Sequence, residues 1–301
     1  MTFSNRFAVF FIAAAVSLGG HASQFQELFQ LAQANDPSYI AAQHTLNSKL
    51  EIIPQANSAF MPEISGSVNE NQSLNAGANV HTYGVKIALP LRLDAFYSLK
   101  VAEKMAAGSR INFEKTHQNL IFSVIDRYVA VIKQQHQMSS SLAEVTAVEQ
   151  RLKQTQQQVD LGISSIIELQ DVKANFQQLQ VNLLQVQQDL SLARANLENL
   201  TNQTLPPKLP ALASSFNAAS LVAIDSLENW FELALNNNLD IAHNKLAVQQ
   251  AYHNYQVKDV GLYPKASISM SQNYSSSTGT TQYLAVGVTG TFFDGGLNQS
   301  Q

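Results

Sequence analysis

Residues 161–202 read LGISSIIELQDVKANFQQLQVNLLQVQQDLSLARANLENLTN, and their pattern is the strongest indication of the architecture. It opens with a glycine-containing turn at 161–165 and continues with apolar residues at alternating spacings of three and four. Such heptad spacing predicts a helix over 166–202 that packs along one seam against another helix. The seam positions are Leu169, Val172, Phe176, Leu179, Leu183, Val186, Leu190, Ala193, Leu197 and Leu200.

The segment before the turn supplies the partner helix. From 94 to 160 the chain runs without a proline and with a single glycine, Gly108. A helix of that length spans about 100 Å at the standard rise, which no compact domain accommodates. Its looser heptad consists of Met138, Leu142, Val145, Leu152 and Val159. We therefore predict a long antiparallel coiled-coil pillar, with one helix over 94–160 and a return helix over 166–202.

Alternation of apolar with small or polar residues predicts two β-hairpins, over about 60–93 and about 262–293. Strands of this length with one apolar face suit a transmembrane β-barrel, which crosses lipid in roughly 9 to 11 tilted residues. A soluble sandwich would give a similar alternation. Aromatic residues at the predicted strand ends favour the barrel, because they suit a membrane interface. They are Phe60, Tyr83, Tyr263, Tyr274, Tyr283, Phe292 and Phe293.

The chain contains two copies of one pattern, because 26–71 aligns without a gap with 228–273. Eight identities fall within this alignment. Phe29, Leu31, Ala32, Asn35, Pro62, Ser65, Ser67 and Asn71 align with Phe231, Leu233, Ala234, Asn237, Pro264, Ser267, Ser269 and Asn273. Each copy begins with a predicted helix, over 24–57 and 227–260, and continues through the aligned proline into a hairpin.

Two internal repeats follow from this alignment. The first covers 23–204, and the incomplete second covers 227–301. Three prolines, at 206, 207 and 210, end the return helix, so 205–226 is predicted to be a loose connector.

The N-terminus predicts a secretory signal peptide over 1–22. Arg6 supplies the positive charge, Phe7 to Leu18 form an apolar run, and Gly20-His21-Ala22 offers small residues for cleavage. The apolar run is too short for a membrane-spanning helix, which needs roughly 20 residues.

Composition argues against nucleic-acid binding and catalysis. The net charge of −4 supplies no broad basic surface for phosphates, and the chain has no cysteine for a thiolate metal site or a nucleophile. The seven histidines show no metal-ligand spacing, and no serine lies in a nucleophile elbow. The sequence therefore predicts no catalytic residues, no metal ligands and no cofactor.

Several short motifs, in their order and spacing, resemble the TolC family of outer membrane efflux proteins. They are LAQANDP at 31–37, FMPEI at 60–64, LGISS at 161–165 with ELQ at 168–170, NLTN at 199–202 and FFDGG at 292–296. The likeness covers nearly the whole chain after residue 22. Glu168 stands where the family often has Asp, and Asp94-Ala95 stands where the second repeat has Asp294-Gly295-Gly296.

This resemblance implies a homotrimer in the outer membrane. Each protomer would contribute four strands to one shared barrel and a set of helices to a periplasmic tunnel. Such a duct is passive, and it exports drugs, toxins or proteins, as in efflux and type I secretion, with a periplasmic adaptor and an inner-membrane transporter. The turn between the long helices would contact the adaptor through Gly162, Ser164, Ser165 and Glu168.

The resemblance also implies a second long hairpin, equivalent to 94–200, which the sequence does not reach before Gln301. We therefore expect a truncated member, or else a degenerate one, and a chain that alone forms no open, stable trimer.

Two rival interpretations are a periplasmic adaptor and a structural coiled-coil envelope protein. The first would need a β-rich lipoyl-like module, and the second gives no role to two matched hairpins.

Overall fold

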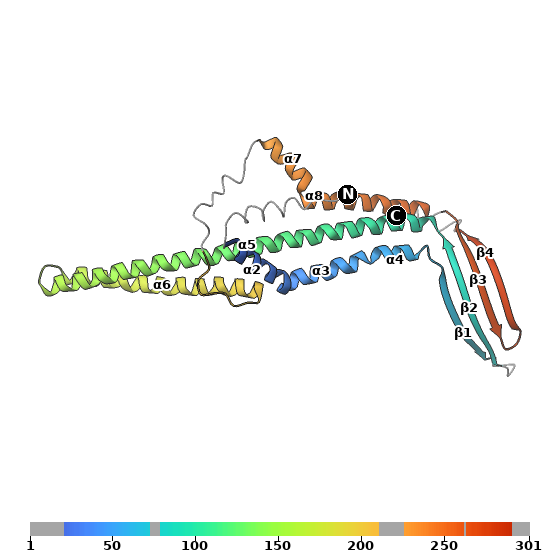
Figure 1. Cartoon of the computed structure of the whole chain (residues 1–301), viewed down its shortest axis with the longest axis horizontal. Coiled ribbons are helices and arrows are strands. Elements are labelled where there is room, and N and C mark those ends of the chain that lie inside the picture. The colour runs from blue at the N-terminus through green and yellow to red at the C-terminus, as the bar shows by residue number, and fades with distance from the viewer. Residues whose placement is uncertain (1–20, 73–78, 211–225, 262, 291–301) are drawn as a thin grey trace. The chain divides into compact units, whose positions relative to one another are not determined.

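The structure is a computed structural model that describes residues 21–72, 79–210, 226–261 and 263–290. It divides into two units, one built from Met1–Ala42 with Thr116–Asp225 and the other from Gln43–Lys115 with Ser226–Gln301. The helices, drawn in Figure 1, are α2 (His21–Asn35), α3 (Pro37–Leu50), α4 (Ile52–Ser58), α5 (Leu93–Asp160), α6 (Ile166–Thr201), α7 (Leu227–Asn237) and α8 (Leu239–Val260). The strands are β1 (Glu63–Gln72), β2 (Asn79–Leu91), β3 (Lys265–Ser275) and β4 (Gly279–Thr289).

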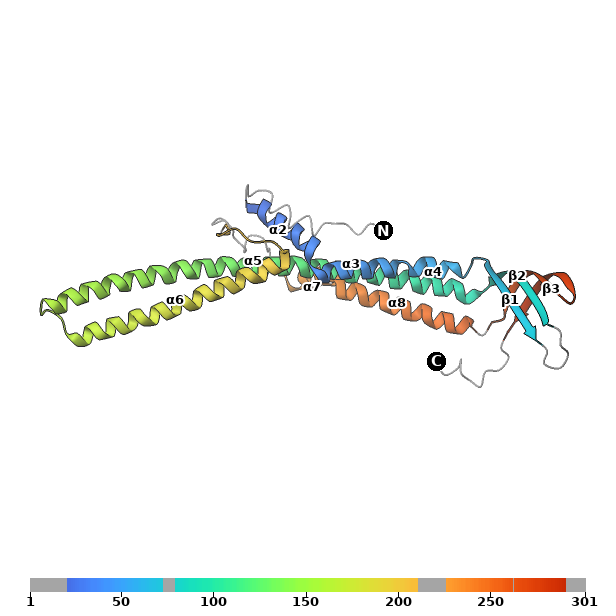
Figure 2. The same cartoon turned by 90° about the horizontal axis from the view of Figure 1, so that it is seen from below.

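In the first unit, α6 folds back along α5 as an antiparallel hairpin (Figure 2). All ten predicted seam positions of α6 are buried or half-buried, from Leu169 to Leu200. The seam of α5 differs from the prediction at Leu142, which is exposed. Buried Ser141 and Thr155 lie on the seam instead, together with Val145. The heptad pattern of α5 is incomplete in the sequence because two of its seam positions hold small polar residues, Ser141 and Thr155.

The predicted single helix over 24–57 is wrong, because it is broken into α2, α3 and α4. The first break follows Asn35, where Asp36 caps α3 by accepting a hydrogen bond from the Ser38 N–H at 2.9 Å. Pro37 occupies the first position of α3, where its missing N–H costs nothing. Pro54, in the first turn of α4, accounts for the second break.

The predicted helix over 227–260 is also wrong, because it divides into α7 and α8 at Asn238. The Asn238 side chain caps α8, accepting hydrogen bonds from the N–H groups of Asp240 and Ile241 at 2.8 and 3.1 Å. Asn238 aligns with Asp36 in the repeat, so both copies break at the same place.

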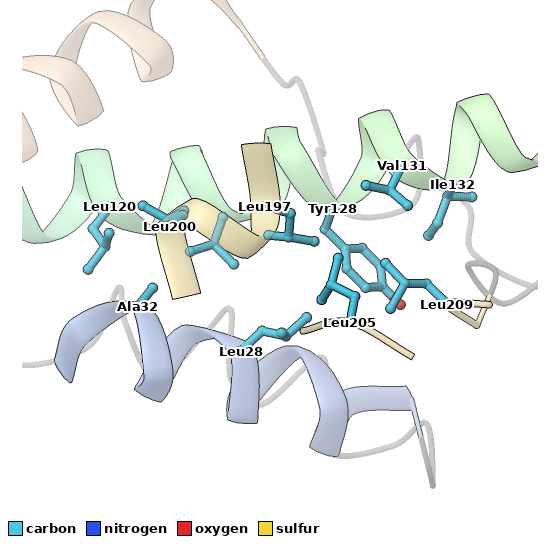
Figure 3. Close-up of a cluster of buried hydrophobic side chains, with 11 residues drawn as sticks. Leu28, Ala32, Leu120, Tyr128, Val131, Ile132, Leu197, Leu200, Leu205 and Leu209 are labelled. Carbon is cyan, nitrogen blue, oxygen red and sulfur yellow. The ribbon is translucent and has the colours of Figure 1, made fainter. Parts of the chain in front are cut away.

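The hydrophobic core of the first unit gathers where α2 packs on the α5–α6 hairpin (Figure 3). Its buried members are Leu28, Ala32, Leu120, Val124, Tyr128, Val131, Ile132, Leu197, Leu200, Leu205 and Leu209. Two of them, Leu205 and Leu209, come from the segment after α6. This segment therefore closes the core from a third side.

The prediction of a loose connector over 205–226 is wrong for residues 205–210, which are held in place by side chains. Residues 211–225 of the predicted connector lie outside the described residues. The Arg194 guanidinium donates hydrogen bonds to the carbonyls of Leu205, Pro206 and Pro207 at 2.8 to 3.0 Å. Glu198 accepts from the Leu205 N–H at 2.9 Å. We call residues 205–210 the strap.

A third side chain holds the end of the strap. The Tyr128 hydroxyl donates to the Pro210 carbonyl at 2.9 Å, and burial raises the pKa of Tyr128. The prolines of the strap lack the N–H donors that a regular backbone ladder needs, and the strap carbonyls accept hydrogen bonds from side chains.

Arg194→Ala is expected to lower the free energy of unfolding by about 1–3 kcal/mol, because three carbonyls lose a charged donor. Urea unfolding followed by circular dichroism measures this. The matched control is Arg151→Ala on the exposed surface of α5, which should stay within about 0.5 kcal/mol of wild type. Equal effects of the two substitutions would contradict the role given to Arg194.

In the second unit, the four strands form one antiparallel sheet in the order β1-β2-β3-β4 (Figure 1). The register pairs Ile64 with Ile87, Ile87 with Met270, and Met270 with Leu284, so apolar residues of all four strands share one face. We call it the apolar face. Its exposed large apolar side chains are Ile64, Val68, Tyr83, Val85, Ile87, Leu91, Ile268, Met270, Tyr274, Leu284, Val286 and Val288, and Leu89 on the same face is half-buried.

The opposite face carries small and polar residues, and we call it the polar face. Ser65, Lys86, Ser271 and Tyr283 lie in one row across it. The two strands next to β2 crowd Gly84, since a Cβ there would lie 2.5 Å from Asn273 Oδ1 and 2.8 Å from Ser67 Oγ and would force these side chains to move.

The prediction that the aromatic residues mark strand ends is only partly right. Tyr274 lies near the end of β3, and Phe60 and Tyr263 lie just before β1 and β3. Tyr83 and Tyr283, in contrast, lie inside their strands. Tyr83 stacks on Tyr274 across the β2–β3 pair, with ring centroids 6.3 Å apart. Phe292 and Phe293 lie outside the described residues.

The predicted fold class is confirmed: the protein is mainly helical, with a long antiparallel helical hairpin and two β-hairpins in a two-copy arrangement. The predicted signal peptide at 1–22 falls almost wholly outside the described residues.

Candidate functional site

The turn between α5 and α6 brings together all four residues predicted to contact a partner. Gly162 has φ of 71°, a left-handed conformation that favours glycine. Its N–H donates to the Val159 carbonyl at 2.9 Å, and the Ile163 N–H donates to the Gln158 carbonyl at 2.8 Å. These bonds end α5 in the manner of a glycine C-cap and reverse the chain.

Ser165 begins the return helix as its N-cap. Its hydroxyl accepts a hydrogen bond from the Ile167 N–H at 3.1 Å. Ser164 donates its own hydroxyl to Glu168 Oε2 at 2.7 Å. Glu168 therefore serves two purposes: it lies in the first turn of α6, where the helix dipole favours an acid, and it fixes the preceding serine.

Sequence reasoning missed the aliphatic side chains at this turn. Leu161, Ile163, Ile166 and Ile167 are all exposed, and Ile163 keeps 73% of its surface open to solvent. We call these four residues the tip patch. The signal was present in the sequence, since four large aliphatic residues crowd into seven positions between helices rich in glutamine. An exposed apolar patch with a polar rim is typical of a surface that binds another protein.

The sheet provides the second candidate surface. Its apolar face is exposed across all four strands, whereas its polar face holds serine, threonine and asparagine side chains with Lys86 as a central charge. Lys86 makes no ion pair with any of the residues that the structure describes. A sheet with this division can separate an apolar environment on one side from water on the other.

An ionic cluster fixes the sheet to the start of α5. Asp94, in the first turn of α5, accepts two hydrogen bonds from the Arg92 guanidinium, at 3.1 and 2.5 Å. Lys265 Nζ, at the start of β3, lies 3.6 Å from Asp94 Oδ2. The Asp94 side chain is only 10% exposed. The cluster therefore joins the end of β2, the start of β3 and the start of α5.

The same contacts set the ionisation of the cluster. The hydrogen bonds from Arg92 hold the pKa of Asp94 below its ordinary value of 3.8, against an opposing effect of burial, and the charges of Arg92 and Lys265 add to the lowering. In turn, the hydrogen bond to Asp94 raises the pKa of Arg92.

Asp94→Asn is expected to lower the free energy of unfolding at pH 7 by about 1–3 kcal/mol, because Arg92 and Lys265 lose a charged partner. Folding lowers the pKa of Asp94, so its ionised form stabilises the fold above pH 3.8, and this contribution is lost as the pH falls through the folded-state pKa. The difference between variant and wild type should therefore shrink below pH 3.8.

Chemical denaturation at a series of pH values checks this expectation. The control is Asp171→Asn, an exposed carboxylate on α6 that makes no ion pair within the described ranges. A difference between Asp94→Asn and wild type that stayed constant from pH 7 to pH 2 would show that ionisation of Asp94 is not its source.

Neither a metal centre nor a membrane-spanning helix is found among the described residues. No group of three or more His, Cys, Asp or Glu side chains in these residues is arranged to hold a metal ion. None of the helices in the same part of the chain combines the length and hydropathy needed to cross a membrane.

The sequence pattern of the outer membrane efflux protein family matches residues 28–203, more than half of the chain. Outer membrane protein TolC of Vibrio cholerae serotype O1 is 24% identical over 262 residues, which cover 85% of this chain and 59% of that protein. The alkaline protease secretion protein AprF of Pseudomonas aeruginosa is 22% identical over 275 residues, covering 85% and 56%. This chain therefore spans between 56% and 59% of the length of these two relatives.

Solved structures show the same fold. The crystal structure of CusC superposes with a TM-score of 0.79 over 92% of this chain and 68% of that chain, at 16% sequence identity. At so low an identity, the likeness concerns the path of the backbone alone.

Proposed function

We infer that this chain, which belongs to the outer membrane efflux protein family, is a subunit of an outer membrane channel for efflux or type I secretion. Its cargo would be drugs, toxins or proteins, in keeping with relatives such as AprF, whose name describes secretion of an alkaline protease.

The observation that carries this proposal is the sheet with two unlike faces. Its strands have 10, 13, 11 and 11 residues, and tilted strands of about 9 to 11 residues cross the hydrocarbon core of a bilayer. In the proposed channel, two further copies of the chain complete a closed barrel. The apolar face then contacts lipid, and the polar face lines a water-filled pore.

The helical part of the chain would lie in the periplasm. The coiled-coil hairpin ends in the exposed tip patch. We propose that Gly162, Ser164, Ser165 and Glu168 shape this tip for a periplasmic adaptor, while the tip patch supplies the apolar contact area. An inner-membrane transporter would then drive export, and the channel itself would be passive.

The two alternative functions receive less support. A periplasmic adaptor or a structural coiled-coil protein could use the α5–α6 hairpin, but neither gives a use to a four-stranded sheet whose apolar face is exposed on every strand.

Disruption of the gene in its own host tests the proposal. Cells lacking the chain should accumulate ethidium severalfold faster than wild-type cells, and a plasmid copy should restore efflux. Uptake of a large, excluded antibiotic is the control, because it should change only if the membrane itself has become leaky. Unchanged ethidium accumulation, together with unchanged protein secretion into the medium, would refute the channel function.

A further inference from the structure

One row of the polar face gathers four hydrogen-bonding side chains that the chain itself does not use. The row crosses all four strands and consists of Ser65, Lys86, Ser271 and Tyr283. Within the described ranges, these side chains make no hydrogen bond and no ion pair. We call them the lysine row.

The lysine row has the composition of an anion-binding surface. Its ammonium group offers three N–H donors, and each of its three hydroxyl groups offers one O–H donor. Neighbouring strands lie about 4.8 Å apart, so the four side chains line up over about 14 Å. Hydrogen bonds from an ammonium to an anionic oxygen are roughly twice as strong as those between neutral groups. A carboxylate, phosphate or sulfonate group therefore finds both charge and donors here.

The rows between the lysine row and the hairpin turns are neutral. They consist of Ser67, Gly84, Asn273 and Thr281, followed by Asn69, Thr82, Ser275 and Gly279. A solute that approaches from the turns therefore meets Lys86 as the first charge on the polar face of the described strands.

Two other charges of the polar face lie on the helix side of the lysine row. Lys265 is held by Asp94, with 3.6 Å between Nζ and Oδ2. Glu63 lies in the next row toward the helices, opposite Ala88, and the ion pairs of the described residues do not join it to Lys86. The charge of Lys86 is therefore not cancelled by a salt bridge within the sheet.

Closure of the sheet into a barrel strengthens this charge. In the channel proposed above, three copies of the chain place three Lys86 ammonium groups around one pore. Walls of low dielectric constant focus the field of such charges into the water between them. Rings of lysine or arginine side chains select anions in pores.

We propose that the lysine row is an anion-selecting site of the pore, which attracts small solutes carrying a carboxylate, phosphate or sulfonate group. This inference rests on the proposed channel, because there the polar face lines a water-filled path. The site biases the local concentration of small ions severalfold and does not block cations.

A thiol placed beside the row reports its charge. Ser67→Cys introduces the only thiol of the chain opposite Gly84, with its Cα about 8 Å from that of Lys86 and about 13 Å from that of Glu63. In isolated outer membranes, this thiol is modified with two methanethiosulfonates of similar size, one bearing a sulfonate and the other a trimethylammonium group. Each rate is divided by the rate with free 2-mercaptoethanol, which removes the intrinsic reactivity of the reagent.

We expect the normalised rate of the sulfonate reagent to exceed that of the ammonium reagent at about 10 mM salt, where the screening length is about 30 Å. Lys86→Gln should lower the ratio of the two rates about threefold or more, because the nearest positive charge is lost. Lys86→Arg should preserve the ratio, and Glu63→Gln should raise it. The matched control is Lys173→Gln, an exposed lysine of α6, which should leave the ratio unchanged.

An equal ratio with and without Lys86→Gln would overturn the inference, and so would an equal fall in Lys173→Gln. The channel itself is checked separately with a neutral, water-soluble maleimide. This reagent should label Ser67→Cys and spare Val68→Cys, its neighbour on the apolar face. Equal labelling would refute the channel and the inference together, whereas unequal labelling with an unchanged ratio would refute the inference alone.

Discussion

Leu197→Ala is expected to lower the free energy of unfolding by about 2–5 kcal/mol, because it opens a cavity at the centre of the core. Leu197 is 0% exposed and lies among side chains from α2, α5 and the strap (Figure 3). These surroundings come from three separate segments of the chain, which cannot easily collapse into the space. Urea unfolding followed by circular dichroism measures the loss.

Leu192→Ala is the matched control, since it makes the same chemical change earlier on α6, at a side chain that is 62% exposed. It should cost less than about 0.5 kcal/mol. Similar losses from the two substitutions would mean that α2 and the strap do not close a core over Leu197.

Ile163→Glu is expected to abolish efflux while leaving the fold intact. A charge at the centre of the tip patch would have to be desolvated on contact with a partner, and losing a central contact of this kind typically costs about 2 kcal/mol or more, which is roughly a thirtyfold loss of affinity. Because Ile163 makes no buried contact within the chain, the free energy of unfolding should not change.

Ethidium accumulation in cells and urea unfolding of the purified protein separate these two effects. Gln170→Glu adds the same charge at an exposed position of α6 close to the tip, and it should preserve efflux. If Ile163→Glu cells exported ethidium as well as wild-type cells, the tip patch would not be the partner surface.

The parts of the fold that could be predicted from the sequence are those governed by periodicity. The seam of α6 and the alternation in the strands repeat many times, so local exceptions do not obscure them. The misses have local causes. Asp36 and Pro37 break a helix by capping and by a missing N–H, and Ser141 and Thr155 fill seam positions where an apolar residue was expected. The strap depends on the long-range contacts of Arg194, which no local pattern reveals.

The candidate site was predicted in part for a similar reason. The turn at Gly162 has a clear signature, since a glycine followed by serines ends one helix and begins the next. The neighbouring tip patch was overlooked because the exposure of Ile166 and Ile167 depends on where the seam ends, at Leu169. The continuity of the apolar face depends on the register between β2 and β3, which lie far apart in the sequence.

The most direct test of the membrane channel is the labelling of two adjacent residues of β4. The chain has no cysteine, so Ala285→Cys and Val286→Cys each introduce a single thiol. Both positions are exposed in the isolated chain, Ala285 on the polar face and Val286 on the apolar face. In isolated outer membranes, a water-soluble maleimide should label Ala285→Cys and leave Val286→Cys unlabelled. Equal labelling of the two would contradict a sheet that separates lipid from water.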